Sequence, residues 1–574
     1  PDPVIVIPGI MGSATKYPGG IGKLEIDPIL HTYDNLIATL KKNGYKEDEN
    51  LFLFPYEWRD SNIQSAQKLK EKIDEIKKQT GRPKVDLVAH SMGGLVARHY
   101  IEGGNYEGDV DQLITLGTPH KGAPKAYLKW EAGEGFFSAT DKLSKIFFEM
   151  EAHHNGFGSI KDYIQTRILS VKELLPNYSY LQEASGGATK NYPDNYPQNT
   201  FLEFLNSLNR LNNMKNVDFT NIIGNTKEND TIEKYKVIKS DKEGIWEHGM
   251  PENYYDNTTD RGIVHGRGDE TVPLSSAEGI ASDNKIILDS SHGDLPTSAE
   301  CEVFRELTGN QKCSEMNIFD KITDILTFSV FSPIDIQIES PSGERIGKNF
   351  DTGDELNEIE GAFYTGYNTE NEFITIPNPE DGEYRILTEG TGSGEYTIEI
   401  VKIVDSASGA DSTEDTEIEI IGTAEPDVQE EVKVEIDGGQ VKKVEKQMLS
   451  ETEDQKESDA EKEPAEDISE KNHPDLPSIQ KTDILKGKVR QFFNNRKIRS
   501  RKKVKKISQK LSHIRINLKR YSLEKNLKKM KKYQSKINTR IGKLKRFISK
   551  DSPRVIDADA AESLIADLED LKTD

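Results

Sequence analysis

Ser91 lies in the run AHSMG, after an apolar stretch at 85–88 that predicts a buried strand and before a helical pattern at 95–101. A sharp strand-to-helix turn exposes a serine hydroxyl above a sheet and aims the next backbone N–H at a developing oxyanion. Ala89 stands where this turn usually has glycine, and alanine is small enough for the same turn. We therefore predict that Ser91 is a nucleophile and that Met92 donates a hydrogen bond to the oxyanion, rather than that Ser91 is a buried turn serine.

A serine hydroxyl becomes a good nucleophile only when a base takes its proton. In hydrolases with this turn the base is a histidine, and an acidic residue orients it. The three catalytic residues follow the chain order serine, acid, histidine. The run GRGDETVP contains Asp269, and DSSHGDLP contains His292 after a predicted strand at 284–289. We predict that His292 accepts and returns the serine proton and that Asp269 orients the imidazole ring of His292. Asp260 and Asp294 are the alternative acids.

A second oxyanion donor is expected near the start of the chain. The run VIVIPGIMGS at 4–13 is an apolar strand that ends in a Pro-Gly turn, and it makes Ile10 the candidate donor. A second aromatic stretch contains Tyr56, Trp58 and Arg59. These three residues are candidates for contact with a substrate head group, although an arginine beside an aromatic ring is more often a structural ion-pair partner.

Strand and helix patterns alternate over residues 1–312, which predicts an α/β fold with a mostly parallel sheet covered by helices on both faces. Aromatic helical segments without clear strands interrupt this rhythm, so we expect a cap inserted at about 125–262. We interpret residues 1–312 as an α/β-hydrolase catalytic domain.

Short alternating segments separated by turn residues predict a small antiparallel β-sandwich over 316–440. An acidic segment poor in aromatic residues predicts a disordered linker at 441–480. Residues 481–574 are predicted to form a basic helical tail with an acidic C-terminal end. The apolar stripe of this tail would fit two short helices or one helix with a register shift.

The charge is divided very unequally along the chain. The whole chain carries a formal charge of −23, yet residues 486–550 hold 26 Lys and Arg against one acidic residue. Such a segment can bind an anionic membrane or a cell-wall polymer. Nucleic acid binding or neutralisation of the chain's own acidic segments are alternatives, and we favour the anionic surface over nucleic acid. The oligomeric state stays open.

The motifs resemble, in order, those of the lecithin:cholesterol acyltransferase family of α/β-hydrolases, which is similar to lysosomal phospholipase and phospholipid:diacylglycerol acyltransferase. The matching runs are IPGIMGS, FPYEWRDS, VAHSMGGLVARHY, LGTPHKGAP, LLPNYSYL, GDETVP and SHGDLP, all within the first 310 residues. The resemblance implies a Ser91, Asp269 and His292 triad with oxyanion donors at Ile10 and Met92. Glu270 departs from the family, which usually has glycine there.

The function expected from these residues and this resemblance is that of a serine esterase, lipase or O-acyltransferase that acts on lipid esters through an acyl-serine. A peptidase or amidase on the same triad is the enzyme alternative, and a catalytically inert surface-binding protein is the non-enzyme alternative. The mechanism requires no metal or organic cofactor.

We expect the protein to be secreted or associated with the cell surface. The chain begins at Pro1 with an apolar run close behind, as in a mature or truncated chain. Cys301 and Cys313 are the two cysteines. They would close a short loop, and we slightly favour a disulfide over two free thiols.

Overall fold

The structure is a computed structural model, and residues 1, 16–22, 185–186, 243, 257–260, 320, 368–370, 405–415 and 438–439 are left out of its description. Beyond 448 it describes only 507, 538, 541–546, 548, 564–565 and 568. The chain divides into two compact units, Pro1–Glu453 and Asp454–Asp574. Most of the predicted linker and tail therefore lies outside the described residues.

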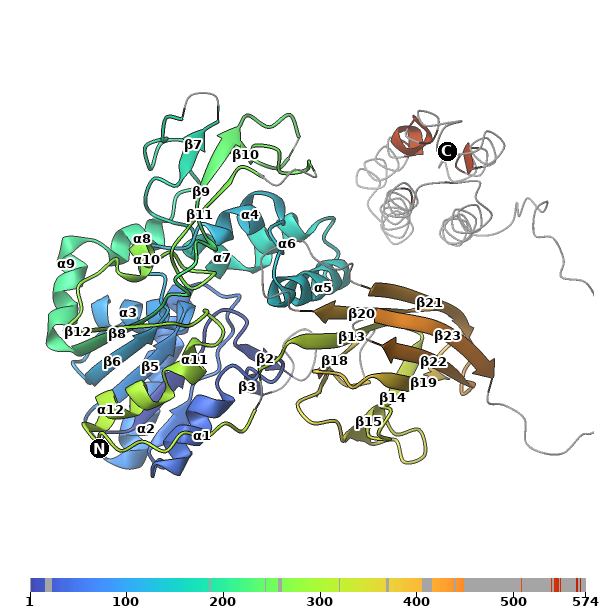
Figure 1. The fold of residues 1–574 in the computed structure, drawn as a ribbon, viewed down its shortest axis with the longest axis horizontal. Coiled ribbons are helices and arrows are strands. Elements are labelled where there is room, and N and C mark those ends of the chain that lie inside the picture. The colour runs from blue at the N-terminus through green and yellow to red at the C-terminus, as the bar shows by residue number, and fades with distance from the viewer. Residues whose placement is uncertain are drawn as a thin grey trace, which may run out of the picture. The chain divides into compact units, whose positions relative to one another are not determined.

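A six-stranded parallel sheet forms the centre of the first unit, with the strand order β12-β8-β6-β5-β1-β4 (Figure 1). Its strands are β1 (Val4–Ile7), β4 (Leu51–Leu53), β5 (Val85–His90), β6 (Val110–Leu116), β8 (Asp218–Gly224) and β12 (Asn284–Leu288). Helices cover it: α1 (Asp34–Lys42), α2 (Asn62–Thr80), α3 (Met92–Glu102), α11 (Leu295–Ser298) and α12 (Glu300–Thr308).

The central strands read as continuous apolar runs because both faces of the sheet are covered. In β1, Ile5 and Ile7 belong to the core shared with α2 and α3, whereas Val4 and Val6 belong to the core shared with α1 and α12. Successive side chains of a strand point to opposite faces. The α/β fold with helices on both faces is as the alternating pattern predicts.

A cap follows β6 and interrupts the sheet. Its helices are α4 (Lys125–Ala132), α5 (Ala139–His154), α6 (Ile160–Arg167), α7 (Leu169–Glu173), α8 (Thr200–Leu205) and α9 (Leu208–Leu211). Its strands are β7 (Leu181–Glu183), β9 (Thr231–Ile238), β10 (Met250–Pro251) and β11 (Ile263–Gly266), which form a separate small sheet. The predicted cap range of 125–262 needs one correction, because β8 falls inside it yet pairs with β6 and β12 in the central sheet.

Two antiparallel sheets follow the α/β part, with strand orders β17-β18-β13-β20-β21 and β16-β15-β14-β19-β22-β23. The strands of the first are β13 (Asp324–Phe331), β17 (Phe363–Tyr364), β18 (Asn371–Pro377), β20 (Gly394–Val404) and β21 (Thr416–Ala424). Those of the second are β14 (Ile334–Glu339), β15 (Arg345–Lys348), β16 (Glu355–Asn357), β19 (Gly382–Gly390), β22 (Gln429–Asp437) and β23 (Gln440–Met448). Alternate side chains of both sheets share one core. Because β23 runs to Met448, the strands extend eight residues past the predicted boundary at 440.

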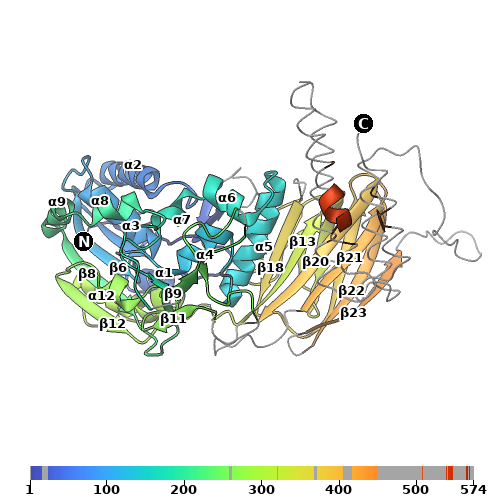
Figure 2. The same ribbon diagram turned by 90° about the horizontal axis from the view of Figure 1, so that it is seen from above.

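Cap helix α5 packs against the outer face of the first of these sheets, and Figures 1 and 2 both show α5 beside it. The contact joins Leu143 and Met150 of α5 to Ile325, Phe373 and Ile403. In β13, Ile325 faces the helix while its neighbour Leu326 faces the core between the sheets. The part of this sheet around Ile325, Phe373 and Ile403 is therefore buried on both faces.

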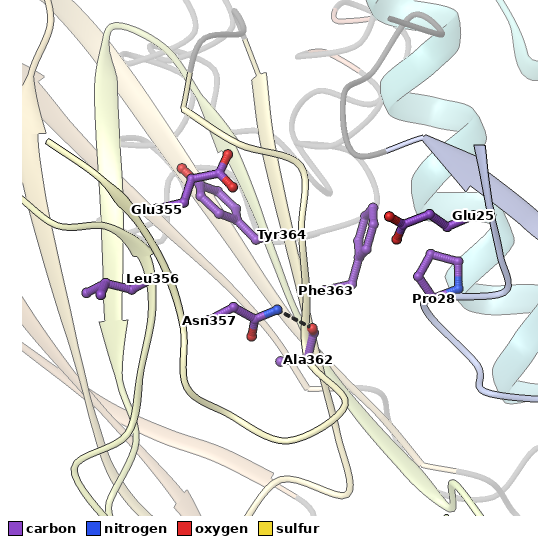
Figure 3. A pocket seen from close by; sticks show the side chains of 8 residues that line it. All are labelled: Glu25, Pro28, Glu355, Leu356, Asn357, Ala362, Phe363 and Tyr364. Carbon is purple, nitrogen blue, oxygen red and sulfur yellow. Dashed lines mark hydrogen bonds between the residues drawn. The ribbon is translucent and has the colours of Figure 1, made fainter. Parts of the chain in front are cut away.

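A small pocket lies beside this contact, where the α/β part meets the edge strands of both antiparallel sheets (Figure 3). Glu25 of β3 (Leu24–Ile26), together with Pro28, lines one side. The opposite side comes from β16 and β17, where the Asn357 side chain donates to the Ala362 carbonyl at 2.9 Å. The pocket lines the junction and includes none of the predicted site residues.

The segment that joins the α/β part to the antiparallel sheets is fastened along α1. Asn35, Thr39 and Asn43 follow each other at intervals of four, so they lie on one helix face. Their side chains bind backbone atoms of residues 314–319, among them the Met316 N–H, which donates to Thr39 Oγ1 at 2.7 Å. A Cys301–Cys313 disulfide closes the same segment onto α12. Among the described residues, no helix is both long and apolar enough to span a bilayer.

Candidate active site

The turn between β5 and α3 holds Ser91 in an unusual backbone conformation, with φ 53° and ψ −125°. A non-glycine residue at positive φ is strained, and such strain is concentrated at functional sites. The neighbouring Gly93 is required by close approach, because a Cβ there would lie 2.4 Å from the Pro8 carbonyl oxygen. The turn thus presses the start of α3 against the loop after β1, and Ser91 is 6% exposed.

His292 lies between Ser91 and Asp269. Its Nε2 atom is 2.8 Å from Ser91 Oγ, and its Nδ1 atom is 2.8 Å from Asp269 Oδ2. The backbone N–H of His292 also donates to the Asp269 carbonyl at 2.8 Å. Gly117 leaves room for this pair, since a Cβ there would lie 3.2 Å from His292 Nδ1. The structure therefore brings the three residues predicted as a triad into one hydrogen-bonded chain.

The Asp269 carboxylate is held by its own turn. It is 1% exposed, and its Oδ1 accepts from the N–H groups of Thr271 and Val272 at 3.1 and 2.7 Å. Glu270 sits in this turn at φ 72°, in the left-handed region that favours glycine. The departure at Glu270 is thus accommodated by strain at that residue, and the carboxylate of Asp269 keeps its direction.

The two alternative acids are placed differently. Asp294 accepts from Ser291 Oγ and pairs with Lys321 Nζ, each at 2.8 Å. Asp260 lies outside the described residues. Of the predicted acids that the structure describes, only Asp269 bonds to the His292 ring.

The predicted oxyanion donors sit at the ends of two neighbouring segments. Met92 begins α3, so its N–H has no acceptor within the helix. Within the described part of the chain, the Ile10 N–H makes no hydrogen bond either. The loop that carries Ile10 is held on both sides, because Gly12 N–H donates to the Gly9 carbonyl and Tyr56 Oη donates to the Pro8 carbonyl, each at 3.1 Å.

Tyr56, Trp58 and Arg59, the candidate head-group contacts, have partners within the chain. Trp58 Nε1 donates to the Ser13 carbonyl at 3.0 Å, and both aromatic residues are 2% exposed. Arg59 pairs with Glu151 of α5 at 2.7 Å and stacks over the Trp58 ring. These contacts give the three residues a structural role between the loop after β1 and the cap, and their contact with substrate stays a prediction.

Two residues that the sequence did not single out contact this site. His90 Nδ1 lies 2.8 Å from Tyr33 Oη, and His90 Nε2 lies 3.0 Å from the His292 carbonyl oxygen. Burial and the nearby His292 hold the pKa of His90 well below its usual range, so its ring is neutral. His90 precedes Asp269 in the chain, so the order serine, acid, histidine does not point to it, and no local pattern marks Tyr33.

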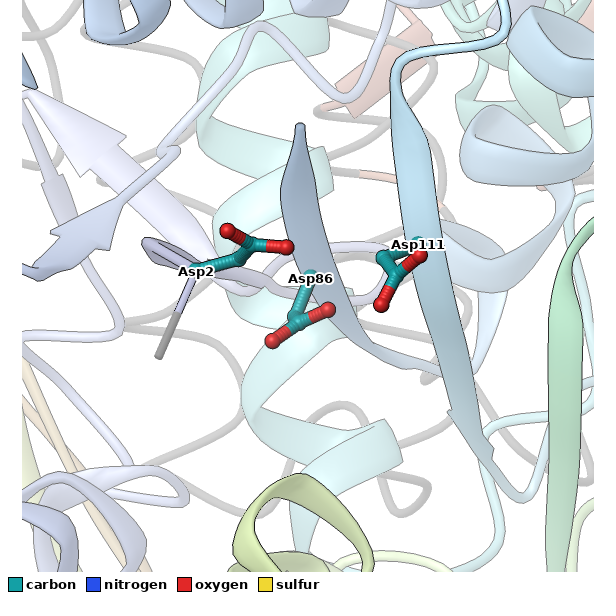
Figure 4. A group of neighbouring side chains, drawn as sticks. All are labelled: Asp2, Asp86 and Asp111. Carbon is teal, nitrogen blue, oxygen red and sulfur yellow. The ribbon is translucent and has the colours of Figure 1, made fainter. Parts of the chain in front are cut away.

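Acidic groups that could hold a metal ion occur elsewhere in the described part of the chain. Asp2, Asp86 and Asp111 form one group, at the edge of β1, β5 and β6 away from Ser91 (Figure 4). A second group consists of Asp74, Glu107 and Asp109, which form ion pairs with Lys70 and Lys77. Neither group includes a predicted site residue.

This arrangement can support acyl transfer. Ser91 can lose its proton to His292, the Asp269 carboxylate can stabilise the imidazolium that forms, and two backbone N–H groups lie on the two segments that flank the serine. A parallel sheet with this serine turn, a buried acid and a histidine after the last strand defines an α/β-hydrolase fold.

The family comparison agrees with that class. The family model described as lecithin:cholesterol acyltransferase matches residues 21–239. The resemblance to this family predicted from the motifs is therefore confirmed over these residues.

Individual relatives match shorter parts of the chain. Phospholipase A(1) LCAT3 of Arabidopsis thaliana is 35% identical over 104 residues, which cover 17% of this chain and 23% of that protein. A putative phospholipid:diacylglycerol acyltransferase 2 of the same plant is 30% identical over 138 residues, 21% of each chain. The phosphatidylcholine-sterol acyltransferase of Mus musculus is 34% identical over 103 residues, 17% of this chain and 23% of that one. The chain thus spans about a fifth of the length of the relatives it matches.

Among solved structures, the Bacillus licheniformis lipase BlEst2 in its propeptide form matches with 14% sequence identity and a TM-score of 0.30. The match covers 77% of this chain and 95% of that chain. The mature form of the same lipase matches at 18% identity with a TM-score of 0.28, over 53% of this chain and 91% of that one.

Proposed function

We propose that the protein is a serine hydrolase or O-acyltransferase that acts on lipid esters. The observation that carries the proposal is the unbroken hydrogen-bonded chain from Ser91 through His292 to Asp269, with both bonds at 2.8 Å. The phospholipase and acyltransferase names of the relatives favour a lipid ester over a peptide or an amide as the substrate.

In the proposed first half-reaction, Ser91 Oγ attacks the ester carbonyl while His292 Nε2 takes the hydroxyl proton. The N–H groups of Ile10 and Met92 donate to the oxyanion of the tetrahedral intermediate. Protonated His292 then gives its proton to the departing alcohol, and acyl-Ser91 remains. Asp269 stays ionised and keeps Nδ1 protonated, so that Nε2 is free to accept.

In the second half-reaction, water or an alcohol attacks acyl-Ser91 and gives its proton to His292. Protonated His292 returns this proton to Ser91 Oγ as the bond from Oγ to the acyl group breaks, which releases the acid or the new ester and restores the free serine. Water makes the enzyme a lipase or phospholipase, and an alcohol makes it an O-acyltransferase. The triad is the same in both cases, so the acceptor has to be identified from products. A labelled phospholipid incubated with and without an added long-chain alcohol would yield labelled fatty acid alone for a hydrolase and labelled ester for a transferase.

The test of the nucleophile is labelling with a fluorophosphonate, which reacts with an activated serine. Wild-type protein should be labelled and should hydrolyse a short p-nitrophenyl ester. Ser91→Ala should lose the label and fall below about 1% of wild-type activity. Ser65→Ala is the matched control, because the Ser65 hydroxyl is buried in α2 with no hydrogen-bond partner in the described part of the chain. A labelled Ser91→Ala protein would contradict the assignment.

We further propose that residues 1–312 act as the catalytic domain and that residues 316–448 form an accessory β-sandwich. The proposal is supported by the core that the two antiparallel sheets share, and by the contact of the first sheet with cap helix α5. An extracellular or cell-surface location agrees with the Cys301–Cys313 disulfide, because such bonds persist in oxidising compartments.

The basic segment at 486–550 is proposed to bind an anionic surface. Its 26 Lys and Arg against one acidic residue support this, since each basic residue near such a surface contributes about 1 kcal/mol. The apolar stripe of the segment offers the competing role of helix pairing, and its members Ile541, Leu544 and Ile548 are buried.

Co-sedimentation with phosphatidylglycerol vesicles tests the surface role. Intact protein should bind at low salt and lose binding at high salt, because exposed charges are screened over about 10 Å at 0.1 M. A chain that ends at residue 453 should not bind, and it should keep full turnover on a soluble ester. Equal, salt-independent binding by both chains would refute the surface role.

A further inference from the structure

Tyr33 and His90 form a buried pair that touches both sides of the site. Tyr33 precedes α1 and is 2% exposed, while His90 ends β5 and is 6% exposed. On one side, the Gly9 N–H donates to Tyr33 Oη at 2.8 Å. On the other side, His90 Nε2 lies 3.0 Å from the carbonyl oxygen of His292.

The hydrogens of this pair can be assigned from its partners. A carbonyl oxygen only accepts, so His90 Nε2 carries a hydrogen and donates it to His292. In a neutral ring Nδ1 is then an acceptor, and Tyr33 Oη donates to it at 2.8 Å. Because that hydroxyl also accepts from Gly9, every polar atom of the pair is used, and all of the bonds run in one direction from Gly9 to His292.

Each end of this chain is attached to a segment that must be placed accurately. Gly9 immediately precedes Ile10, the proposed oxyanion donor. A bond to the Gly9 N–H helps fix the plane of the Pro8–Gly9 peptide, which adjoins the peptide that carries the Ile10 N–H. The His292 carbonyl belongs to the residue proposed as the base, whose N–H is already bound to the Asp269 carbonyl. His90 itself is the residue before Ser91.

We propose that Tyr33 and His90 are positioning residues that fix the oxyanion loop and the His292 loop relative to each other and to Ser91. The proposal rests on the catalytic function proposed above. Neither side chain exchanges a proton with substrate in this role. The neutral state of His90 suits it, because its ring centroid lies 4.8 Å from that of His292, where a second positive charge would oppose the imidazolium.

The test compares Tyr33→Phe with Tyr45→Phe in the full chain. Tyr33→Phe removes one hydroxyl and leaves both Gly9 N–H and His90 Nδ1 without their partner. Tyr45 follows α1, is 5% exposed, and has a hydroxyl with no hydrogen-bond partner in the described part of the chain, so Tyr45→Phe removes the same atom without breaking a bond. His90→Asn is the second variant, because an amide can replace Nδ1 toward Tyr33 but provides nothing at the position of Nε2.

On a soluble p-nitrophenyl ester, Tyr33→Phe and His90→Asn should each lower kcat/KM by about 10- to 100-fold, less than the loss of an oxyanion donor. Tyr45→Phe should match wild type. The affinity for a trifluoromethyl ketone, which adds to the serine and forms an oxyanion, should fall by the same factor as kcat/KM. A merely structural role would lower the melting temperature without this parallel loss.

The double variant distinguishes a connected pair from two separate contacts. If the two residues act as one unit, Tyr33→Phe/His90→Asn should lose no more activity than the worse single variant. Activity of Tyr33→Phe equal to that of Tyr45→Phe, or full multiplication of the two losses, would overturn the proposal. Fluorophosphonate labelling of wild type separates failure of the proposed function from failure of the positioning role. An unlabelled wild type contradicts the proposed function. A labelled wild type whose Tyr33→Phe and His90→Asn variants keep full activity contradicts only the positioning role.

Discussion

Ser91 Oγ and His292 Nε2 lie 2.8 Å apart although 201 residues separate them in the chain. The serine immediately follows the central strand β5, and the histidine lies in the loop after β12, the strand at the edge of the same sheet. In a parallel sheet the loops after the strands gather at one edge, so residues from distant segments meet there. The predictions below test this site and the parts of the fold that support it.

Asp269→Asn should cut turnover severely. An amide cannot stabilise the imidazolium and favours the wrong tautomer of His292, and the corresponding change in a serine protease costs about 10⁴ in kcat. The measurement is kcat on a soluble ester. Asp294→Asn is the control, because Asp294 bonds to Ser291 and Lys321 rather than to the His292 ring. If Asp269→Asn kept nearly normal kcat and Asp294→Asn were inactive, Asp294 and not Asp269 would be the acid of the triad.

Asp86→Asn should stabilise the protein at pH 8. Burial, together with the charges of Asp2 and Asp111, raises the pKa of Asp86 to about 7 (Figure 4). The unfolded chain loses this proton near pH 4, so the folded state loses stability as the pH rises from about 4 through 7. Asparagine carries no such charge and can still accept the Gln112 N–H that bonds to Oδ1.

Urea unfolding of wild type and Asp86→Asn at several pH values measures this effect. The variant should gain about 2–4 kcal/mol at pH 8, and the difference should shrink as the pH falls toward 4. A variant that is less stable at pH 8, or a gain that does not depend on pH, would show that the Asp86 carboxylate is not the source of the destabilisation.

Removing the disulfide should destabilise the α/β part. The bond joins residues 12 apart, and a short loop of this kind contributes about 2–3 kcal/mol. Cys301→Ala/Cys313→Ala should therefore melt at a lower temperature than oxidised wild type. A reductant should lower the melting temperature of wild type and leave that of the double variant unchanged. Equal melting of oxidised wild type and the double variant would mean that the contacts along α1 suffice to hold this segment.

Phe373→Ala should loosen the contact between α5 and the first antiparallel sheet. Phe373 is fully buried and packs against Phe147 with ring centroids 6.3 Å apart, so its truncation should cost about 3–5 kcal/mol. Hydrogen exchange should show lost protection in α5 before any in β13. Phe328→Ala is the control, because Phe328 lies in the core between the two sheets and should expose β13 first. The same exchange pattern in both variants would contradict separate roles for the two faces of this sheet.

The elements that carry the site could be predicted because their signals are local. Residues 85–101 contain an apolar strand, a small-residue turn and a helical pattern in direct succession, and the structure shows β5 and α3 there. Strand β8 was missed as part of the central sheet. Its segment follows a long insertion of helices, and whether a short apolar strand joins the main sheet or the cap is decided by its pairing partners β6 and β12.

The choice of the acid that contacts His292 likewise depends on the fold and not on local sequence. Chain order favours Asp269 over Asp294, which follows His292, but residue order alone does not determine which carboxylate reaches the His292 ring. The fold separates them: the turn that contains Thr271 and Val272 aims Asp269 at the ring, whereas Lys321 and Ser291 bind Asp294.

By itself the sequence determined the alternation of strands and helices, the serine turn and the candidate triad, since each depends on residue types at short spacing or on motif order. Only the tertiary structure decided that Tyr33 and His90, 57 residues apart, connect Gly9 to the His292 carbonyl, and that Tyr56, Trp58 and Arg59 are bound within the chain. Hydrogen bonds between such distant residues depend on how strands and loops pack together. No local periodicity encodes that packing, so these contacts could be recognised only in the folded chain.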